Sequence, residues 1–175
     1  MAAKKKVKKK VTPKKAAPKK KAAPKKKAAP KKKAAPKKKA APKKKAAGII
    51  IQEVFFEAPP SVIYRAYLDP KQHAEFTGAG AKNNGIVGGT FEAWDGYITG
   101  TNEELVETAR IVQSWRTTEF PGDHPDSRLE LHLDGTNGRT RVRLVHSGVP
   151  EDQRTGYEEG WHEHYWEPLR AYLAR

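Results

Sequence analysis

The sequence predicts an α+β fold in which a curved antiparallel sheet wraps around a long C-terminal helix, preceded by a disordered arm. Three observations predict it. All 20 acidic and all 15 aromatic residues of the 175-residue chain lie after position 48. Several short segments after that position alternate apolar with polar residues, as half-buried strands do. The final segment carries an apolar stripe at helical spacing. We therefore expect an arm at 1–48 and one globular domain at 49–175.

Residues 1–48 form a cationic arm with 23 lysines, no arginine and no acidic residue. From Ala16 the arm repeats Lys-Lys-Lys-Ala-Ala-Pro, so a proline recurs at every sixth position. It has no aromatic residue and buries too little apolar surface to offset its chain entropy, so we expect disorder. Residues 49–175 hold 12 basic and 20 acidic residues, and the domain therefore has a net charge of −8.

A flexible strand of ammonium groups is suited to nucleic acid. Each phosphate that a lysine neutralises releases condensed counterions, and the lack of arginine argues against bidentate base recognition. The composition resembles the lysine-, alanine- and proline-rich tails of linker histones and of some bacterial nucleoid proteins. The arm is predicted to bind DNA or RNA without sequence specificity through its clustered lysines, which are Lys14, Lys15, Lys19, Lys20, Lys21, Lys25, Lys26, Lys27, Lys31, Lys32, Lys33, Lys37, Lys38, Lys39, Lys43, Lys44 and Lys45.

The arm also has alternative interpretations. It is a solubilising extension without a dedicated partner, or it binds an acidic protein or the acidic domain of its own chain. Anionic lipid is a weaker candidate, because the arm has no aromatic or aliphatic face to insert beside its lysines.

The composition excludes several classes of protein. The chain has no cysteine, which rules out a disulfide framework, a thiolate metal site and a thiol nucleophile. No apolar segment of signal-peptide length follows the lysines, and no run approaches the roughly 20 apolar residues of a membrane span. We expect a cytoplasmic protein that the arm associates with the nucleoid.

The first part of the domain should contain one strand and two short helices. Residues 49–57 are rich in Ile, Val and Phe and predict a strand. Two prolines end this strand and begin a helix at 61–68. An Asp-Pro pair then begins a second helix at 69–76. Residues 78–89 hold five glycines and two asparagines, so we expect a flexible loop, placed as a lip over a cavity mouth.

An antiparallel meander is expected next. An Asp-Gly dipeptide between residues 91–94 and 97–106 is a strong signal for a two-residue hairpin turn. Residues 110–117 predict the third strand of this run. Two more strands are predicted near 128–133 and 139–146, where apolar and charged residues alternate strictly.

The chain ends in a predicted amphipathic helix that starts within 149–152, where two acidic residues lie near its positive end. Pro168 should kink its last turns. The apolar stripe recurs every four residues and consists of Tyr157, Trp161, Tyr165, Leu169 and Leu173. A sheet with one apolar face must cover that face, and this helix is the only element large enough to do so.

Five motifs occur in an order that resembles a known family. They lie at residues 87–91, 95–100, 110–116, 148–150 and 160–173. Together they resemble the C-terminal domain of the activator of heat-shock protein 90 ATPase, within the START-like (SRPBCC) superfamily. The resemblance covers essentially all of 49–175 and implies the helix-grip fold. It also implies a chaperone partner, or a cavity under the helix of the kind in which other superfamily members bind apolar ligands.

The candidate site residues belong to this cavity. Trp94, Trp115, Trp161 and Tyr165 are candidate lining residues, although aromatic stripes at helical spacing are more often ordinary core. His146 lies on the apolar side of its strand, either beside the cavity or as a hydrogen-bonded histidine at its rim. No Ser/His/Asp set, close carboxylate pair or metal-ligand spacing stands out, so we predict no catalytic residue, no metal and no cofactor.

These observations lead to one main functional hypothesis and two alternatives. The main hypothesis is a non-enzymatic binding protein whose domain holds a protein partner or an apolar small ligand while the arm tethers it to nucleic acid. The first alternative is a co-chaperone-like activator of a heat-shock protein 90 type ATPase. The second is a cavity enzyme of the cyclase or hydrolase type.

Overall fold

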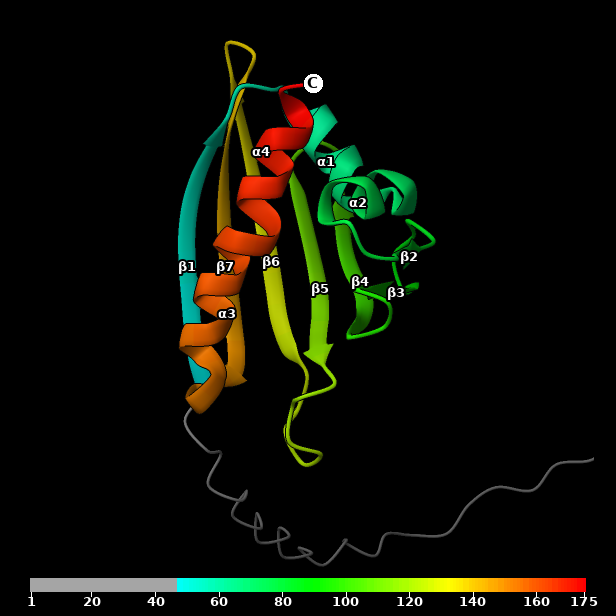
Figure 1. Cartoon of the computed structure of the whole chain (residues 1–175), viewed down its shortest axis with the longest axis vertical. Helices are drawn as coiled ribbons and strands as arrows, with labels where there is room; N and C mark the ends of the chain where they lie inside the picture. Colours follow the sequence, from blue (N-terminus) through cyan, green and yellow to red (C-terminus); the bar gives the residue numbers. More distant parts are fainter. Residues whose placement is uncertain (1–46) are drawn as a thin grey trace, which may run out of the picture. The chain divides into compact units, whose positions relative to one another are not determined.

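The computed structural model describes residues 47–175, so the predictions about the lysine arm lie outside the described part of the chain (Figure 1). Residues 47–175 form an α+β domain in which a curved antiparallel sheet holds a C-terminal helix on one face. The predicted fold class is confirmed. Within 47–175 no helix is both long enough and apolar enough to span a bilayer.

Seven strands form the sheet in the order β1-β7-β6-β5-β4-β3-β2, and each neighbouring pair is antiparallel. The first strand of the domain therefore pairs with the last, which places it beside the C-terminal helix (Figure 1). The strands are β1 (Ala47–Phe56), β2 (Lys82–Asn83), β3 (Thr90–Ala93), β4 (Ile98–Val106), β5 (Arg110–Thr117), β6 (Ser127–Thr136) and β7 (Arg139–Pro150).

The alternation of residue types along each strand decides which side chains are buried. In β1 every second residue is buried, and in β6 Leu129, Leu131 and Leu133 are buried while the charged residues between them are not. Because successive side chains of a strand point to opposite faces, this pattern gives the sheet one apolar face. That face is the one that packs against the helices.

Two short helices, α1 (Pro60–Leu68) and α2 (Pro70–Thr77), follow β1. Each begins with a proline, whose missing N–H has no helical partner at that position in any case. Asp69 caps α2, because its Oδ1 accepts hydrogen bonds from the backbone N–H groups of Lys71 at 2.9 Å and Gln72 at 3.0 Å. Gly78, with φ of 76°, ends α2 in the left-handed conformation.

The predicted Asp-Gly turn is present between β3 and β4, but the strands pair only up to Ala93 and Ile98, so the connection is four residues long rather than two. Asp95 and Gly96 both have positive φ, at 55° and 88°, and the Tyr97 N–H donates to the Trp94 carbonyl at 3.0 Å. Positive φ at both central residues is the requirement that Asp-Gly meets in a type I′ turn. The predicted loop at 78–89 differs in one respect, because it contains the two-residue strand β2, which pairs with β3.

The C-terminal helix is interrupted in its middle. A 3₁₀ turn, η1 (Glu151–Gln153), leads into α3 (Arg154–Trp161), then a π-helical turn, η2 (His162–Trp166), and finally α4 (Glu167–Leu173). Pro168, where the sequence predicted a kink, is the second residue of α4 and lies two residues after the end of the π turn. Proline has no N–H to donate to the carbonyl four residues earlier. Just before it, the Glu167 N–H donates to the His162 carbonyl five residues earlier, which makes this turn π-helical.

The π turn changes which residues the helix buries. It adds one residue to the turn, and both Tyr165 and Trp166 are buried as a result. Trp166 stacks on Trp161 at 5.5 Å between ring centroids and meets Phe56 of β1 edge-on at 6.3 Å. Its indole N–H donates to Gln52 Oε1 at 2.6 Å, so a polar side chain of β1 also holds the helix.

Candidate functional site

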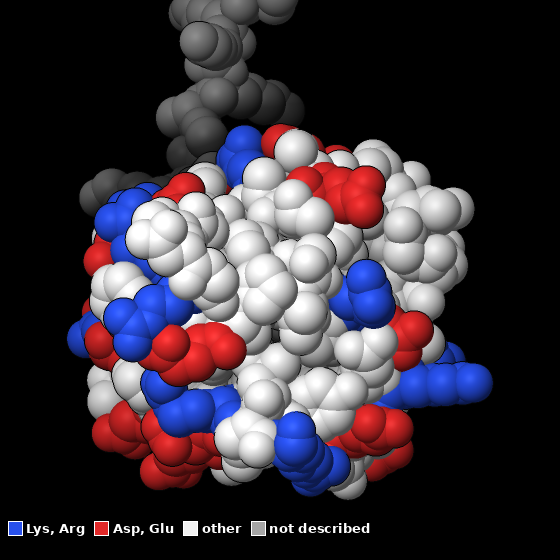
Figure 2. Space-filling model, turned by 90° about the horizontal axis from the view of Figure 1, so that it is seen from above, with Lys and Arg blue, Asp and Glu red and all other residues white. Residues whose placement is uncertain are grey.

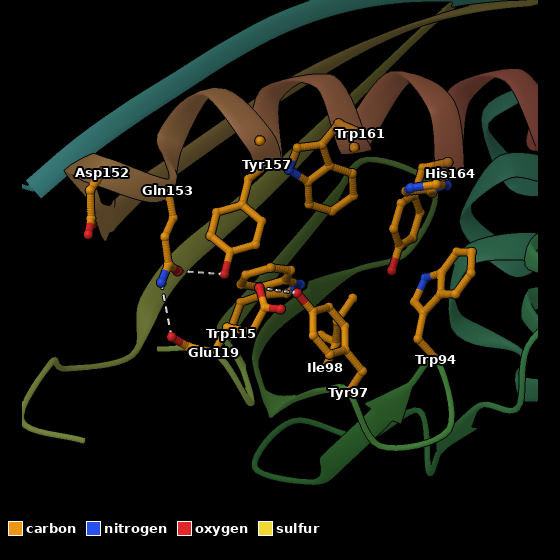
Figure 3. Close-up of a pocket in the computed structure, with 13 residues that line it drawn as sticks. Trp94, Tyr97, Ile98, Trp115, Glu119, Asp152, Gln153, Tyr157, Trp161 and His164 are labelled. Carbon is orange, nitrogen blue, oxygen red and sulfur yellow. Dashed lines mark hydrogen bonds between the residues drawn. The ribbon is translucent and has the colours of Figure 1, made fainter. Parts of the chain in front are cut away.

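A cavity of about 540 Å³ lies between the first half of the C-terminal helix and the sheet (Figure 3). Its walls come from α3 and the π turn on one side, and from the β3–β4 turn, β4 and β5 on the other. The exposed residues Asp152 and Gly156 are part of its lining, so the cavity is open to solvent. Most of its lining side chains are aromatic, namely Trp94, Tyr97, Trp115, Tyr157, Trp161 and Tyr165.

The structure brings four of the five candidate cavity residues together. Trp94 reaches the cavity from the β3–β4 turn, Trp115 from β5 and Trp161 from the helix (Figure 3). Tyr165, in the π turn of the helix, also lines the cavity. Trp115 and Trp161 are 3% and 2% exposed, so each is also part of the core. Trp115 and Trp161 therefore line the cavity and are part of the hydrophobic core at the same time.

His146, the fifth candidate residue, does not line the cavity. It lies fully buried behind the wall, with its ring 4.6 Å from that of Trp115 and 5.8 Å from that of Trp161. The alternation in β7 correctly indicated its apolar side. It did not indicate the depth, because the indoles of Trp115 and Trp161 lie between the histidine and the cavity.

A chain of hydrogen bonds fixes the tautomer of His146. The Trp161 N–H donates to Nδ1 at 3.2 Å, so Nδ1 carries no proton. Ser127 Oγ donates to the Trp115 carbonyl at 2.7 Å and lies 2.8 Å from His146 Nε2, so it accepts the Nε2 proton. Burial lowers the pKa of His146 from 6.5 to about 3, and the ring is neutral at physiological pH.

A second set of hydrogen bonds forms the polar part of the cavity lining (Figure 3). Tyr97 donates to Glu119 Oε2 at 2.9 Å, and burial, followed by this bond, raises the pKa of Tyr97 to about 12. Tyr157 donates to Gln153 Oε1 at 2.8 Å and, in turn, accepts from Thr117 Oγ1 at 2.7 Å. Both tyrosines are therefore neutral phenols that serve as hydrogen-bonding groups rather than as phenolate nucleophiles.

The glycine-rich loop does not form a lip over this cavity. Its lysine, Lys82, pairs with Glu92 of β3 at 2.7 Å, and the backbone N–H of Gly80 donates to Asp95 at 3.1 Å. Residues of this loop line two other hollows beside α1 and α2 rather than the aromatic cavity. The flexible-lip prediction is therefore wrong, because Asn102 of β4 donates a hydrogen bond to Asn83 at 2.9 Å, and Asn83 and Asn84 accept from the loop's own backbone N–H groups.

Sequence reasoning also missed parts of the site. It did not identify Tyr97, Glu119 or Gln153, which come from turns and helix ends whose relative positions depend on the sheet register. It also passed over Gly156 and Gly160, which line the cavity from α3. A signal for these two glycines was present, because two glycines four residues apart are unusual inside an amphipathic helix.

The arrangement is chemically suited to binding. It offers aromatic surface, neutral phenols and two carboxylates, and its lining contains no lysine or arginine. Across residues 47–175 no group of three or more His, Asp or Glu side chains is placed to hold a metal ion. An open cavity between a long helix and a curved antiparallel sheet defines the helix-grip class of proteins.

Comparison with known proteins gives the family within this class. Residues 57–174 match the family model described as activator of Hsp90 ATPase homolog 1-like protein. The chain belongs to this family, and the resemblance inferred from its motifs is confirmed. The human protein named activator of 90 kDa heat shock protein ATPase homolog 1 is 28% identical over 122 residues, which is 70% of this chain and 36% of the human protein. The chain thus matches only about a third of the length of that relative.

Solved structures confirm the fold. An HSP90 activator from Plasmodium falciparum has a TM-score of 0.65 at 21% identity, over 73% of this chain and 96% of that one. CalU16 from Micromonospora echinospora has a TM-score of 0.63 at 24% identity, over 73% of this chain and 77% of that one. At these identities the likeness establishes the helix-grip architecture alone.

Proposed function

We propose that the protein is a co-chaperone-like activator of an ATPase of the 90 kDa heat-shock protein class. The observation that carries this proposal is the family match, which spans every element from α1 to α4. The match favours the co-chaperone alternative over the main hypothesis of a ligand-binding module tethered to nucleic acid. The cavity-enzyme alternative stays a prediction.

An activator needs a surface for its protein partner, and we propose the loop between β2 and β3 as that surface. Ile86 and Val87 at this loop are each 60% exposed, and they are adjacent in the sequence. Exposed aliphatic pairs of this kind lose water when a partner covers them, which favours association. The face of the domain that Figure 2 shows has a mixed character, because acidic and basic side chains are interspersed there around an uncharged centre.

The loop is held rigidly, which lowers the entropy lost on binding. Asn102 of β4 is fully buried and bonds to the loop on both sides of Val87, because its backbone carbonyl accepts from the Gly88 N–H at 2.7 Å and its Nδ2 donates to the Ile86 carbonyl at 3.3 Å. Gln113 Nε2 in turn donates to Asn102 Oδ1 at 2.7 Å. A buried polar network of β4 and β5 therefore fixes the backbone that carries the two exposed side chains.

The test is the steady-state turnover of a purified ATPase of this class with increasing amounts of the full chain. We expect the wild-type chain to raise the turnover, and the double variant Ile86→Ser/Val87→Ser to lose most of that increase at equal concentration. The matched control is Ile51→Ser, which changes a 51% exposed isoleucine of β1, the strand at the opposite edge of the sheet from β2, and should leave the increase intact. No increase with the wild-type chain would contradict the proposed function, whereas equal loss in both variants would contradict only the proposed surface.

A specific feature of the sequence favours a second function for the arm. Its 23 lysines without a single acidic residue suit sequence-nonspecific binding of nucleic acid, which would tether the domain. The test is anisotropy of a labelled random duplex with the full chain and with a chain that begins at residue 47. Only the full chain should bind, and the logarithm of its affinity should fall with the logarithm of salt by about 0.9 per phosphate engaged. Equal binding by both chains would contradict the tether.

A further inference from the structure

The C-terminal helix contains two glycines that its own packing does not require. Gly156 and Gly160 lie in α3, and neither has a positive φ. A Cβ built at Gly156 would meet no atom within 4 Å, and one at Gly160 would meet only His164, at an ordinary 3.7 Å. By contrast, a Cβ at Gly100 would collide with the Ser114 carbonyl, so that glycine has a packing reason.

These two glycines are costly where they are. Glycine in a helix interior lowers stability by roughly 0.5–1 kcal/mol relative to alanine, because its unfolded backbone has more freedom to lose. Both residues line the aromatic cavity, and they are four residues apart, on the same side of the helix. What they provide is space, because any side chain at these positions would extend over or into the cavity.

The cavity walls indicate the shape of the molecule that fits this space. Trp115 and Tyr157 meet edge-on at 5.2 Å, Trp161 and Tyr165 lie 4.5 Å apart, and Trp94 borders the same space (Figure 3). Aromatic rings prefer stacked or edge-to-face contact with other rings. The cavity volume of about 540 Å³ lies within the usual range of small-molecule sites.

The charges of the lining indicate which ligands are excluded. The carboxylates of Glu119 and Asp152 belong to the lining, and no lysine or arginine does. An anionic ligand would therefore be repelled by these carboxylates, and it would lose its hydrating water without an ion pair to a basic side chain in return.

We propose that this cavity is a binding site for a planar aromatic molecule that carries no negative charge, and that Gly156 and Gly160 keep the space for it. This inference is independent of ATPase activation, since it concerns a small molecule rather than the chaperone surface.

The test is titration calorimetry of the full chain with three probes, which are 1-pyrenemethanol, 1-pyrenecarboxylate and 1-decanol. The wild-type chain should bind 1-pyrenemethanol at least about tenfold more tightly than either of the others, a difference of ~1.4 kcal/mol. Gly156→Leu should weaken binding of 1-pyrenemethanol by at least about tenfold, since the side chain occupies the ligand space. The matched control is Thr155→Leu, which adds the same side chain one position away, at an exposed residue that does not line the cavity.

1-Pyrenecarboxylate is also attracted by the positive charge of the lysine arm. Because every variant carries the same arm, a difference in affinity between the wild type and a blocking variant reports on the cavity alone. Gly160→Leu serves as a second blocking variant if Gly156→Leu unfolds, and denaturant unfolding checks both. Equal affinity of the wild type and a folded blocking variant would overturn the proposal. So would 1-decanol binding as tightly as 1-pyrenemethanol, or no binding of 1-pyrenemethanol at all.

Discussion

The two halves of the C-terminal helix differ in how they meet the sheet. The second half is packed, because Trp166 and Leu169 are each 1% exposed and lie against β1 and α2. The first half leaves the aromatic cavity between itself and the sheet, with Tyr157 only partly buried and two glycines facing the space. The π turn lies between the two halves, with Tyr165 in the cavity lining and Trp166 in the packed half.

This difference implies that the two halves of the helix have separate roles, stability in the second half and binding in the first. Apolar burial in the second half holds the helix on the sheet, and the first half then remains in place while it leaves room for a ligand. The Gln52 side chain joins the halves, because it accepts from Trp166 and donates to the Glu158 carbonyl at 2.7 Å. Perturbations in the two halves should therefore have different consequences.

The largest expected effect is on stability in the packed half. Leu169→Ala should lower the free energy of unfolding by about 2–5 kcal/mol, because the site is fully buried and the truncation leaves a cavity. Tyr157→Ala should cost at most about 2 kcal/mol, because its side chain already borders open space. Urea unfolding of both variants measures the difference, and equal costs would contradict the division of the helix.

The next effect concerns His146, which lies behind the cavity wall. Its pKa is about 3 in the folded domain and 6.5 in the unfolded chain, so the unfolded chain binds the extra proton between these values. The free energy of unfolding should therefore fall as pH drops below 6.5, by roughly 2 kcal/mol between pH 6 and pH 4.

Comparison with a variant isolates this contribution from that of the other titrating groups. His146→Gln keeps an amide that donates and accepts but has no proton to bind in this range. Urea midpoints measured from pH 7 to pH 4 should therefore fall less steeply for the variant than for the wild type. Parallel curves would show that His146 does not carry the predicted pH dependence.

The smallest effect sharpens the comparison at the cavity. Gly156→Ala and Gly160→Ala should each raise the free energy of unfolding by about 0.5–1 kcal/mol, because alanine restricts the unfolded chain and its Cβ meets no close atom. Thermal unfolding of the two variants checks this. A decrease in either variant would mean that a packing constraint, rather than the cavity, requires the glycine.

Much of the fold was predictable because local patterns and tertiary packing agree. The alternation in β6 and β7, the Asp95-Gly96 turn and the Asp69 cap each depend on a few neighbouring residues. The π turn was not predictable, because it depends on how Trp166 packs against β1 as well as on Pro168. The strict four-residue spacing of the apolar residues does not indicate that one extra residue enters the turn.

The candidate site was predictable only in part, for a similar reason. Large aromatic residues on a helix and on facing strands were expected to meet, and Trp115 and Trp161 do. The depth of His146, the position of Glu119 and the role of Asn102 depend on strand register and on the irregularity in β4 after Asn102. None of these follows from spacing along the chain.

The most direct test of the divided helix uses the tryptophans. Trp94, Trp115 and Trp161 line the cavity, whereas Trp166 does not. Fluorine NMR of the full chain labelled with 5-fluorotryptophan reports on each of the four as 1-pyrenemethanol is added. We predict large shifts for the three cavity tryptophans and the smallest shift for Trp166, which contacts the lining only from behind, through Trp161 and Tyr165. The largest shift at Trp166, or no shift at any tryptophan, would contradict the account.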